Sequence, residues 1–183
     1  IKRVSAFIVS LPGVPWSYYG DEIGMRFVEG LASVEGGYGR TGSRSPMQWD
    51  STINAGFGVS APEKLYIPVD PDKNRPTVEK NMADENSIYN EVKRLIKLRN
   101  SHPALSNKGE VKFIYAEKDA YPLAYTRELG GEKLLVIINP SAKEADFECD
   151  IVPTGEIYRY GGNAVCENGK VKIAAQSAVI FRI

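Results

Sequence analysis

The hydrophobic positions near the start of the chain recur at the spacing of an amphipathic helix. They are Ile1, Val4, Phe7, Ile8 and Leu11. Because Pro12 and Gly13 are typical helix-ending residues, the pattern predicts a helix over residues 1–11. The run Trp16–Tyr19 is short and continuously apolar, which is typical of a strand buried on both faces of a parallel sheet. A helix that leads into such a strand indicates a (β/α) barrel.

The segment Gly20–Met25 follows this predicted strand. In a barrel, residues just past the end of a strand lie on the active-site face, so we expect this segment to face a ligand. The next residues, to position 83, are rich in glycine and proline and lack a regular period. Large apolar residues within them favour an ordered, functional loop over a disordered one. These anchors are Met47, Trp49, Phe57 and Tyr66.

Helical spacing returns after Asp84, a candidate N-cap, and is carried by Ile88, Val92, Leu95 and Ile96. His102-Pro103 ends this predicted helix. A lone histidine beside a helix-ending proline favours a structural role over a catalytic or metal-binding one.

From Gly109 onward the hydrophobic period changes to two, as in Val111, Phe113 and Tyr115. Turn signals such as Gly130-Gly131 and Asn168-Gly169 separate the predicted strands, with no helical pattern between them. We therefore predict an antiparallel β-sandwich over residues 107–183, able to fold alone.

The chain has 183 residues, and its 23 basic residues equal its 23 acidic ones. Its neutral balance indicates no nucleic-acid or acidic-membrane partner, and no apolar run approaches the ~20 residues that span a bilayer. Cys149 and Cys166, the only cysteines, are expected to be buried free thiols more than a disulfide. We predict no metal site and no cofactor.

Three runs carry a resemblance to a known family: Leu11–Met25, Arg40–Asp50 and Ala55–Phe57. They resemble the α-amylase family of glycoside hydrolases, nearest to oligo-1,6-glucosidases and α-glucosidases. The resemblance implies that residues 1–106 are the C-terminal end of a (β/α)8 barrel and residues 107–183 a C-terminal β domain. The family's catalytic carboxylates would lie upstream of Ile1. No catalytic residue is therefore assigned here, and the chain is expected to be inactive alone.

Arg44 and Arg40 match the two arginines of the family's Arg-x-x-x-Arg-Thr-Pro-Met-Gln-Trp pattern, so the resemblance implies that they bind substrate. A guanidinium can hold a carboxylate in place or bond paired sugar hydroxyls. Thr41, Gly42 and Ser45 depart from the family pattern, which has Asp, Asn and Thr at these positions. These departures leave the preference between α-1,4 and α-1,6 linkages open.

Asp21 and Glu22 are poor candidates for a catalytic pair. A retaining glycosidase needs two carboxyl groups ~5 to 5.5 Å apart, aimed at one sugar carbon. Adjacent residues in extended conformation point to opposite faces. Asp21, Glu22 and Tyr19 are therefore expected to support the site and the barrel wall.

The expected function is that of the C-terminal part of a retaining α-glucoside hydrolase or transglycosylase. Its partners would be an α-glucan or α-gluco-oligosaccharide and the upstream part of the same enzyme, or a second copy of the chain. The alternative is a carbohydrate-binding β domain that displays Tyr158 and Tyr160, which share a strand face. Because the chain begins without Met or a helix cap, it indicates no compartment directly, and the cytoplasm is favoured.

Overall fold

A computed structural model describes residues 1–32 and 38–183, which form two compact units. We call Ile1–Pro15 together with Arg94–Ile183 the β unit, and Trp16–Lys93 the loop unit. In the described part of the chain, no helix is both long and apolar enough to cross a bilayer.

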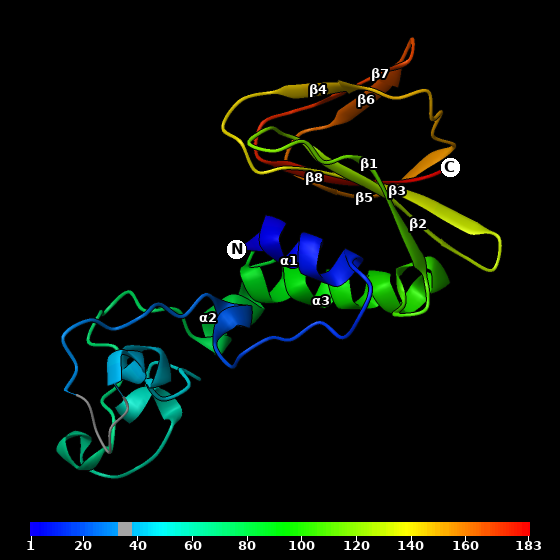
Figure 1. The fold of residues 1–183 in the computed structure, drawn as a ribbon. Helices are drawn as coiled ribbons and strands as arrows, with labels where there is room; N and C mark the ends of the chain where they lie inside the picture. Colours follow the sequence, from blue (N-terminus) through cyan, green and yellow to red (C-terminus); the bar gives the residue numbers. More distant parts are fainter. Residues whose placement is uncertain (33–37) are drawn as a thin grey trace. The chain divides into compact units, whose positions relative to one another are not determined.

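All strands of the β unit pair antiparallel and form two sheets (Figure 1). The larger sheet contains, in spatial order, β1 (Glu110–Tyr115), β2 (Leu123–Leu129), β3 (Glu132–Asn139), β8 (Ser177–Arg182) and β5 (Gly155–Tyr160). The smaller contains β4 (Ala145–Glu148), β7 (Lys170–Ile173) and β6 (Ala164–Glu167). The period of two after Gly109 is thus confirmed as antiparallel strands, and the turn signals fall between them.

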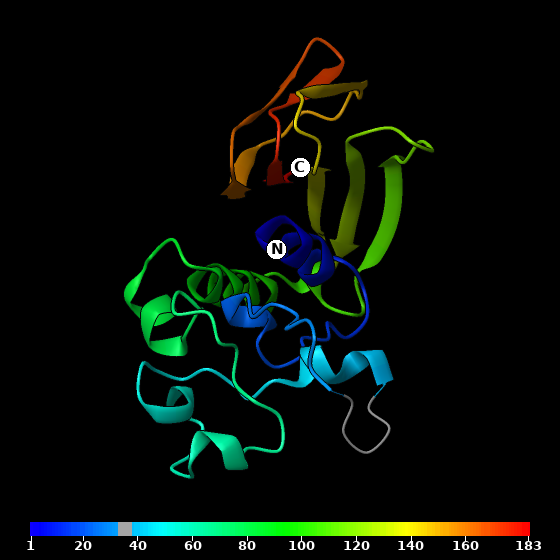
Figure 2. The same ribbon diagram turned by 90° about the vertical axis from the view of Figure 1, so that its left-hand side faces the viewer.

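Each face of the larger sheet borders its own apolar core. One core lies between the sheets and includes Ile137, Phe147 and Ile173. The other lies between the larger sheet and the helices α1 (Lys2–Ser10) and α3 (Ile88–Ser101), which run side by side in Figures 1 and 2. The segment after Gly109 shares this second core with both helices, and its independent folding stays a prediction.

A buried arginine joins the helical layer to the sheet. Arg127 of β2 is fully buried, and its guanidinium donates hydrogen bonds to the carbonyl oxygens of Ser10, Ser106 (2.6 Å) and Gly109 (3.0 Å). Burial lowers the pKa of Arg127. Two residues before it, burial raises the pKa of Tyr125 to about 12, and its hydroxyl lies 2.6 Å from that of Ser10.

The helix predicted at the start is present, but its buried face differs from the predicted stripe. Ile1 and Val4 are exposed, whereas Ala6, Val9 and Ser10 are buried. Phe7 and Leu11 of the predicted stripe still pack, partly buried, against the core that the helices share with the larger sheet, so the predicted stripe is confirmed only in part.

The second predicted helix begins later than Asp84, and a short helix lies before it, in the segment predicted to be irregular. The helix α2 (Val78–Ala83) ends at Asp84, and α3 starts at Ile88. The Ser87 hydroxyl accepts a hydrogen bond from the Asn90 N–H (3.1 Å), which is the bond that an N-cap makes. Asp84 accepts one from the Asn86 N–H (2.9 Å) in the intervening turn, so its prediction as the N-cap was wrong.

The strand predicted at Trp16–Tyr19 is not formed in this structure. Trp16 is 87% exposed. A parallel strand buried on both faces needs neighbouring strands, and the described residues of the loop unit contain none. This segment instead leads into a series of short 3₁₀ helices: η1 (Asp21–Ile23), η2 (Tyr38–Arg44), η3 (Ile53–Gly56) and η4 (Pro62–Lys64).

Candidate functional site

The loop unit contains a pocket of about 330 Å³. Its lining comes from widely separated parts of the unit: Tyr19, Arg44, Pro46, Met47, Phe57 and residues 65–67. Aromatic and aliphatic side chains form most of this lining, and among the described residues Arg44 is its one charged member.

The wall formed by Ser45–Gln48 is buried and fixed by hydrogen bonds. The Tyr19 hydroxyl donates to the Ser45 carbonyl (3.1 Å). The Gln48 side-chain amide donates to the Pro76 carbonyl (2.6 Å), while the Gln48 carbonyl accepts from the Val78 N–H (2.9 Å). The residues after Arg44 are therefore held in place, which restricts where its side chain starts.

Arg44 is exposed at the pocket, and no residue among 1–32 and 38–183 forms a hydrogen bond or ion pair with its guanidinium. Burial raises the pKa of Tyr19 in the same pocket, while the positive charge of Arg44 acts in the opposite direction. Arg40 does not line this pocket, although its carbonyl accepts a hydrogen bond from the Ser43 hydroxyl (2.8 Å). The structure thus brings Arg44 and Tyr19 together and leaves Arg40 apart from them.

The departure from the family pattern at Gly42 agrees with the close packing of the backbone there. A Cβ atom at this position would lie 2.2 Å from the Val28 carbonyl oxygen and 2.7 Å from the Phe27 ring. The Val28 N–H also donates to the Gly42 carbonyl (3.0 Å). No larger side chain fits this backbone arrangement.

A left-handed backbone segment precedes Phe57. Asn54, Ala55 and Gly56 have φ values of 53°, 56° and 71°. Ala55 is fully buried, and its carbonyl accepts hydrogen bonds from the backbone N–H groups of Trp49 (2.8 Å) and Asp50 (3.2 Å). At Gly56 a Cβ would lie 2.7 Å from the Asp50 carboxylate. These contacts hold an unfavourable conformation, so the position of Phe57 is closely fixed.

Two aromatic residues expected to anchor the loop have large exposed areas at the pocket instead. Phe57 is 53% and Tyr66 59% exposed, whereas Met47 is buried as predicted. Their part in the pocket was missed from the sequence, and the signal that could have found Phe57 was its place in the Ala55–Phe57 run.

Asp21 and Glu22 lie in η1, so the extended conformation expected for them is wrong. Asp21 accepts a hydrogen bond from the Tyr18 N–H (2.9 Å), and Glu22 accepts one from the Gly20 N–H (2.8 Å). Both carboxylates bond to the backbone of their own turn.

An ion pair closes the loop beyond the pocket. Arg26 donates two hydrogen bonds of 2.8 Å to the buried Asp70, and these bonds hold the pKa of that carboxyl below its usual range. Within the described ranges, no group of three or more His, Cys, Asp or Glu residues lies close enough together to bind a metal ion.

The other candidate residues lie in the β unit. His102 Nδ1 lies 2.6 Å from Glu132 Oε1, and Glu132 also accepts the Ala104 N–H (2.9 Å), which fixes the end of α3. Tyr158 and Tyr160 are half-buried, and the Lys2 ammonium lies 5.5 Å from the Tyr160 ring centre. The two rings therefore do not form the exposed row expected for a carbohydrate-binding surface.

The two cysteines, Cys149 and Cys166, are free and partly buried against the core between the sheets. Burial raises the pKa of the Cys166 thiol to about 11, which disfavours the reactive thiolate.

Comparison with models of protein families shows which family the chain belongs to. The model of the α-amylase catalytic domain matches residues 1–108. The chain belongs to the α-amylase family. It resembles the C-terminal part of an α-amylase-family glycosidase, and it spans about a third of the length of the curated oligo-1,6-glucosidases that it matches.

Named relatives include the oligo-1,6-glucosidase of Parageobacillus thermoglucosidasius, which is 34% identical over 86% of this chain and 32% of its own length. The trehalose synthase/amylase TreS of Mycobacterium tuberculosis is 33% identical over 82% of this chain and 25% of its own. Among α-amylase-like structures, trehalulose synthase MutB from Pseudomonas mesoacidophila MX-45 superposes with a TM-score of 0.81 at 23% identity. The superposed region covers 99% of this chain and 37% of MutB. At this identity the MutB likeness shows the fold alone.

Proposed function

We propose that this chain is the C-terminal part of a retaining α-glucoside hydrolase or transglycosylase that acts on α-glucans or α-gluco-oligosaccharides. The observation that carries the proposal is the position of Arg44 at an aromatic pocket, within the Arg40–Asp50 run that resembles the α-glucosidases. The names of the relatives, oligo-1,6-glucosidase and trehalose synthase, support both hydrolysis and transfer of an α-glucosyl unit.

In this proposal residues 1–106 form the C-terminal end of a (β/α)8 barrel and residues 107–183 a β-sandwich domain. The family match to residues 1–108 supports a boundary near Gly109. The compact units divide the chain differently, since α1 and the end of α3 share a core with the larger sheet. We propose that both helices belong to the barrel and also provide the surface on which the β domain packs.

Arg44 would bind the sugar or orient a catalytic carboxylate with its two-pronged guanidinium, and Arg40 would bind more remotely. Asp21 and Glu22 would keep the turn after Tyr19 in shape, because both accept hydrogen bonds from its backbone. Tyr19 would hold the pocket wall through Ser45. The nucleophile and the acid/base would be supplied by the upstream part of the enzyme.

The stereochemistry of the product tests the reaction class. The full-length enzyme is incubated with maltose or isomaltose, and the first anomer of glucose released is identified by proton NMR. A retaining mechanism predicts initial α-glucose, or transfer products of α configuration. Initial β-glucose, or no turnover of any α-glucoside, would contradict the proposal. The 183-residue chain, assayed in parallel, is expected to be inactive, and turnover by it would place catalytic groups in this chain.

A further inference from the structure

We propose that Phe57 and Tyr66 form a stacking face for a single pyranose ring in the Arg44 pocket. The inference rests on the proposed function and adds the ligand moiety and the residues that contact it. Its three supports are the chemistry of the lining, the exposure of the two rings and the rigidity of the backbone before Phe57.

The lining matches the two kinds of surface on a sugar. A pyranose ring presents apolar C–H faces and a polar hydroxyl edge. The pocket offers the aromatic rings of Phe57 and Tyr66 together with one guanidinium, Arg44. A wholly apolar group would desolvate that charge without a hydrogen-bond partner, which is unfavourable. A hydroxyl-bearing ring satisfies both parts of the pocket.

Phe57 and Tyr66 combine large exposed areas with a place in the pocket lining. Each is more than half exposed, while Pro46 and Met47 of the same lining are buried. Aromatic side chains gathered at a concave site with one polar group are typical of ligand pockets. The volume of about 330 Å³ is near the lower end of the range for such pockets, about 300–1,000 Å³, which favours one ring over an oligosaccharide.

The backbone before Phe57 is held in a conformation that an alanine rarely adopts. Ala55 has φ 56°, and two backbone N–H groups fix its carbonyl, while the Asn54 side-chain amide donates to Gly58 (3.0 Å) and Ser60 (2.8 Å). Such conformations persist where the surroundings over-determine them, and they gather at ligand-binding sites. A rigid support is what a stacking face requires, because its ring must be placed before the sugar arrives.

The test compares Phe57→Leu with Phe57→Tyr in the full-length enzyme, using maltose and isomaltose. Phe57→Leu is expected to lower kcat/KM by roughly three- to tenfold, as for the loss of one aromatic contact, mainly through KM. Phe57→Tyr keeps the ring and is expected to stay within twofold of wild type.

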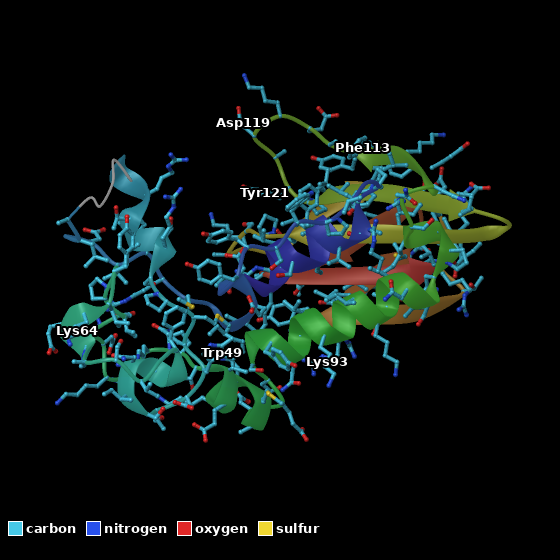
Figure 3. The ribbon with its side chains drawn as sticks, turned by 90° about the horizontal axis from the view of Figure 1, so that it is seen from below. Trp49, Lys64, Lys93, Phe113, Asp119 and Tyr121 are labelled. Carbon is cyan, nitrogen blue, oxygen red and sulfur yellow. The ribbon has the colours of Figure 1, made fainter. Side chains whose placement is uncertain are left out.

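Phe113→Leu is the matched control, because Phe113 is 54% exposed on β1 in the β unit, ahead of the loop that carries Asp119 and Tyr121 (Figure 3). It is expected to leave kcat/KM unchanged. Glucose protection against thermal unfolding provides a second readout, and Phe57→Leu should weaken it. An active wild type with Phe57→Leu unchanged in both kcat/KM and glucose protection would overturn the stacking face alone. An inactive wild type would overturn the proposed function instead.

Discussion

Replacing Arg127 by Met is expected to destabilise the β unit more than any surface change. Its buried guanidinium bonds to carbonyl oxygens from α1 and from the segment before β1. Met cannot donate to the buried carbonyl oxygens of Ser10 and Gly109. Each acceptor left without a donor lowers the free energy of unfolding by about 1–3 kcal/mol. Removal of a buried charge offsets part of this cost, and we expect a net loss of about 2–4 kcal/mol.

Hydrogen exchange measured by mass spectrometry can test this locally. Amide protons of β2, β3 and β8 in the 183-residue chain should exchange roughly 30- to 700-fold faster in Arg127→Met, since about 1.4 kcal/mol corresponds to tenfold in an opening equilibrium. Arg159→Met is the control. Arg159 has a half-exposed side chain, in an ion pair with Glu156 at 3.3 Å, and its loss should change exchange little. Equal exchange in both variants would refute the role given to Arg127.

Two further predictions concern local contacts. Burial alone would raise the pKa of Glu132, but hydrogen bonds from His102 and Ala104 bring this pKa below its ordinary value. The ionised Glu132 therefore stabilises the fold above that ordinary pKa, and this contribution is lost as the pH falls through the lowered pKa. Urea unfolding should therefore show Glu132→Gln less stable than wild type at pH 7 and nearer to it at pH 3, with a constant difference contradicting the account. Gly42→Asn should lower the melting temperature of the loop unit, and an unchanged value would show that the Val28 contact relaxes easily.

The sequence predicted the β strands well because their period and turns are local signals. Val136 and Ile138 on β3 face one core, and Leu135 and Ile137 face the other, as a sheet covered on both sides requires. The continuous apolar run over residues 134–138 is the sequence pattern that indicates a strand buried on both faces. The helices that cover one face could not be assigned to it, because their partner strands lie far away in the chain.

The candidate site was predicted only in part. The Arg40–Asp50 run identified Arg44, yet the sequence could not separate it from Arg40, since only the folded loop places one at the pocket. The sequence predicts Phe57 only as an anchor, because an aromatic residue gives the same sequence signal in a core and in a ligand pocket. The unfavourable φ of Ala55 left no signal of its own, because alanine is compatible with many structures.

The most direct test of the central claim is the kinetics of Arg44 variants in the full-length enzyme. A charge-assisted contact to the sugar or to a catalytic carboxylate contributes ~1.5 to 3 kcal/mol. Arg44→Ala is therefore predicted to lose roughly ten- to hundredfold in kcat/KM on maltose and isomaltose, with an unchanged melting temperature. Arg44→Lys should recover little, because an ammonium cannot replace a planar guanidinium. If both variants remain within twofold of wild type on each sugar, Arg44 does not take part in substrate binding and the proposed site is wrong.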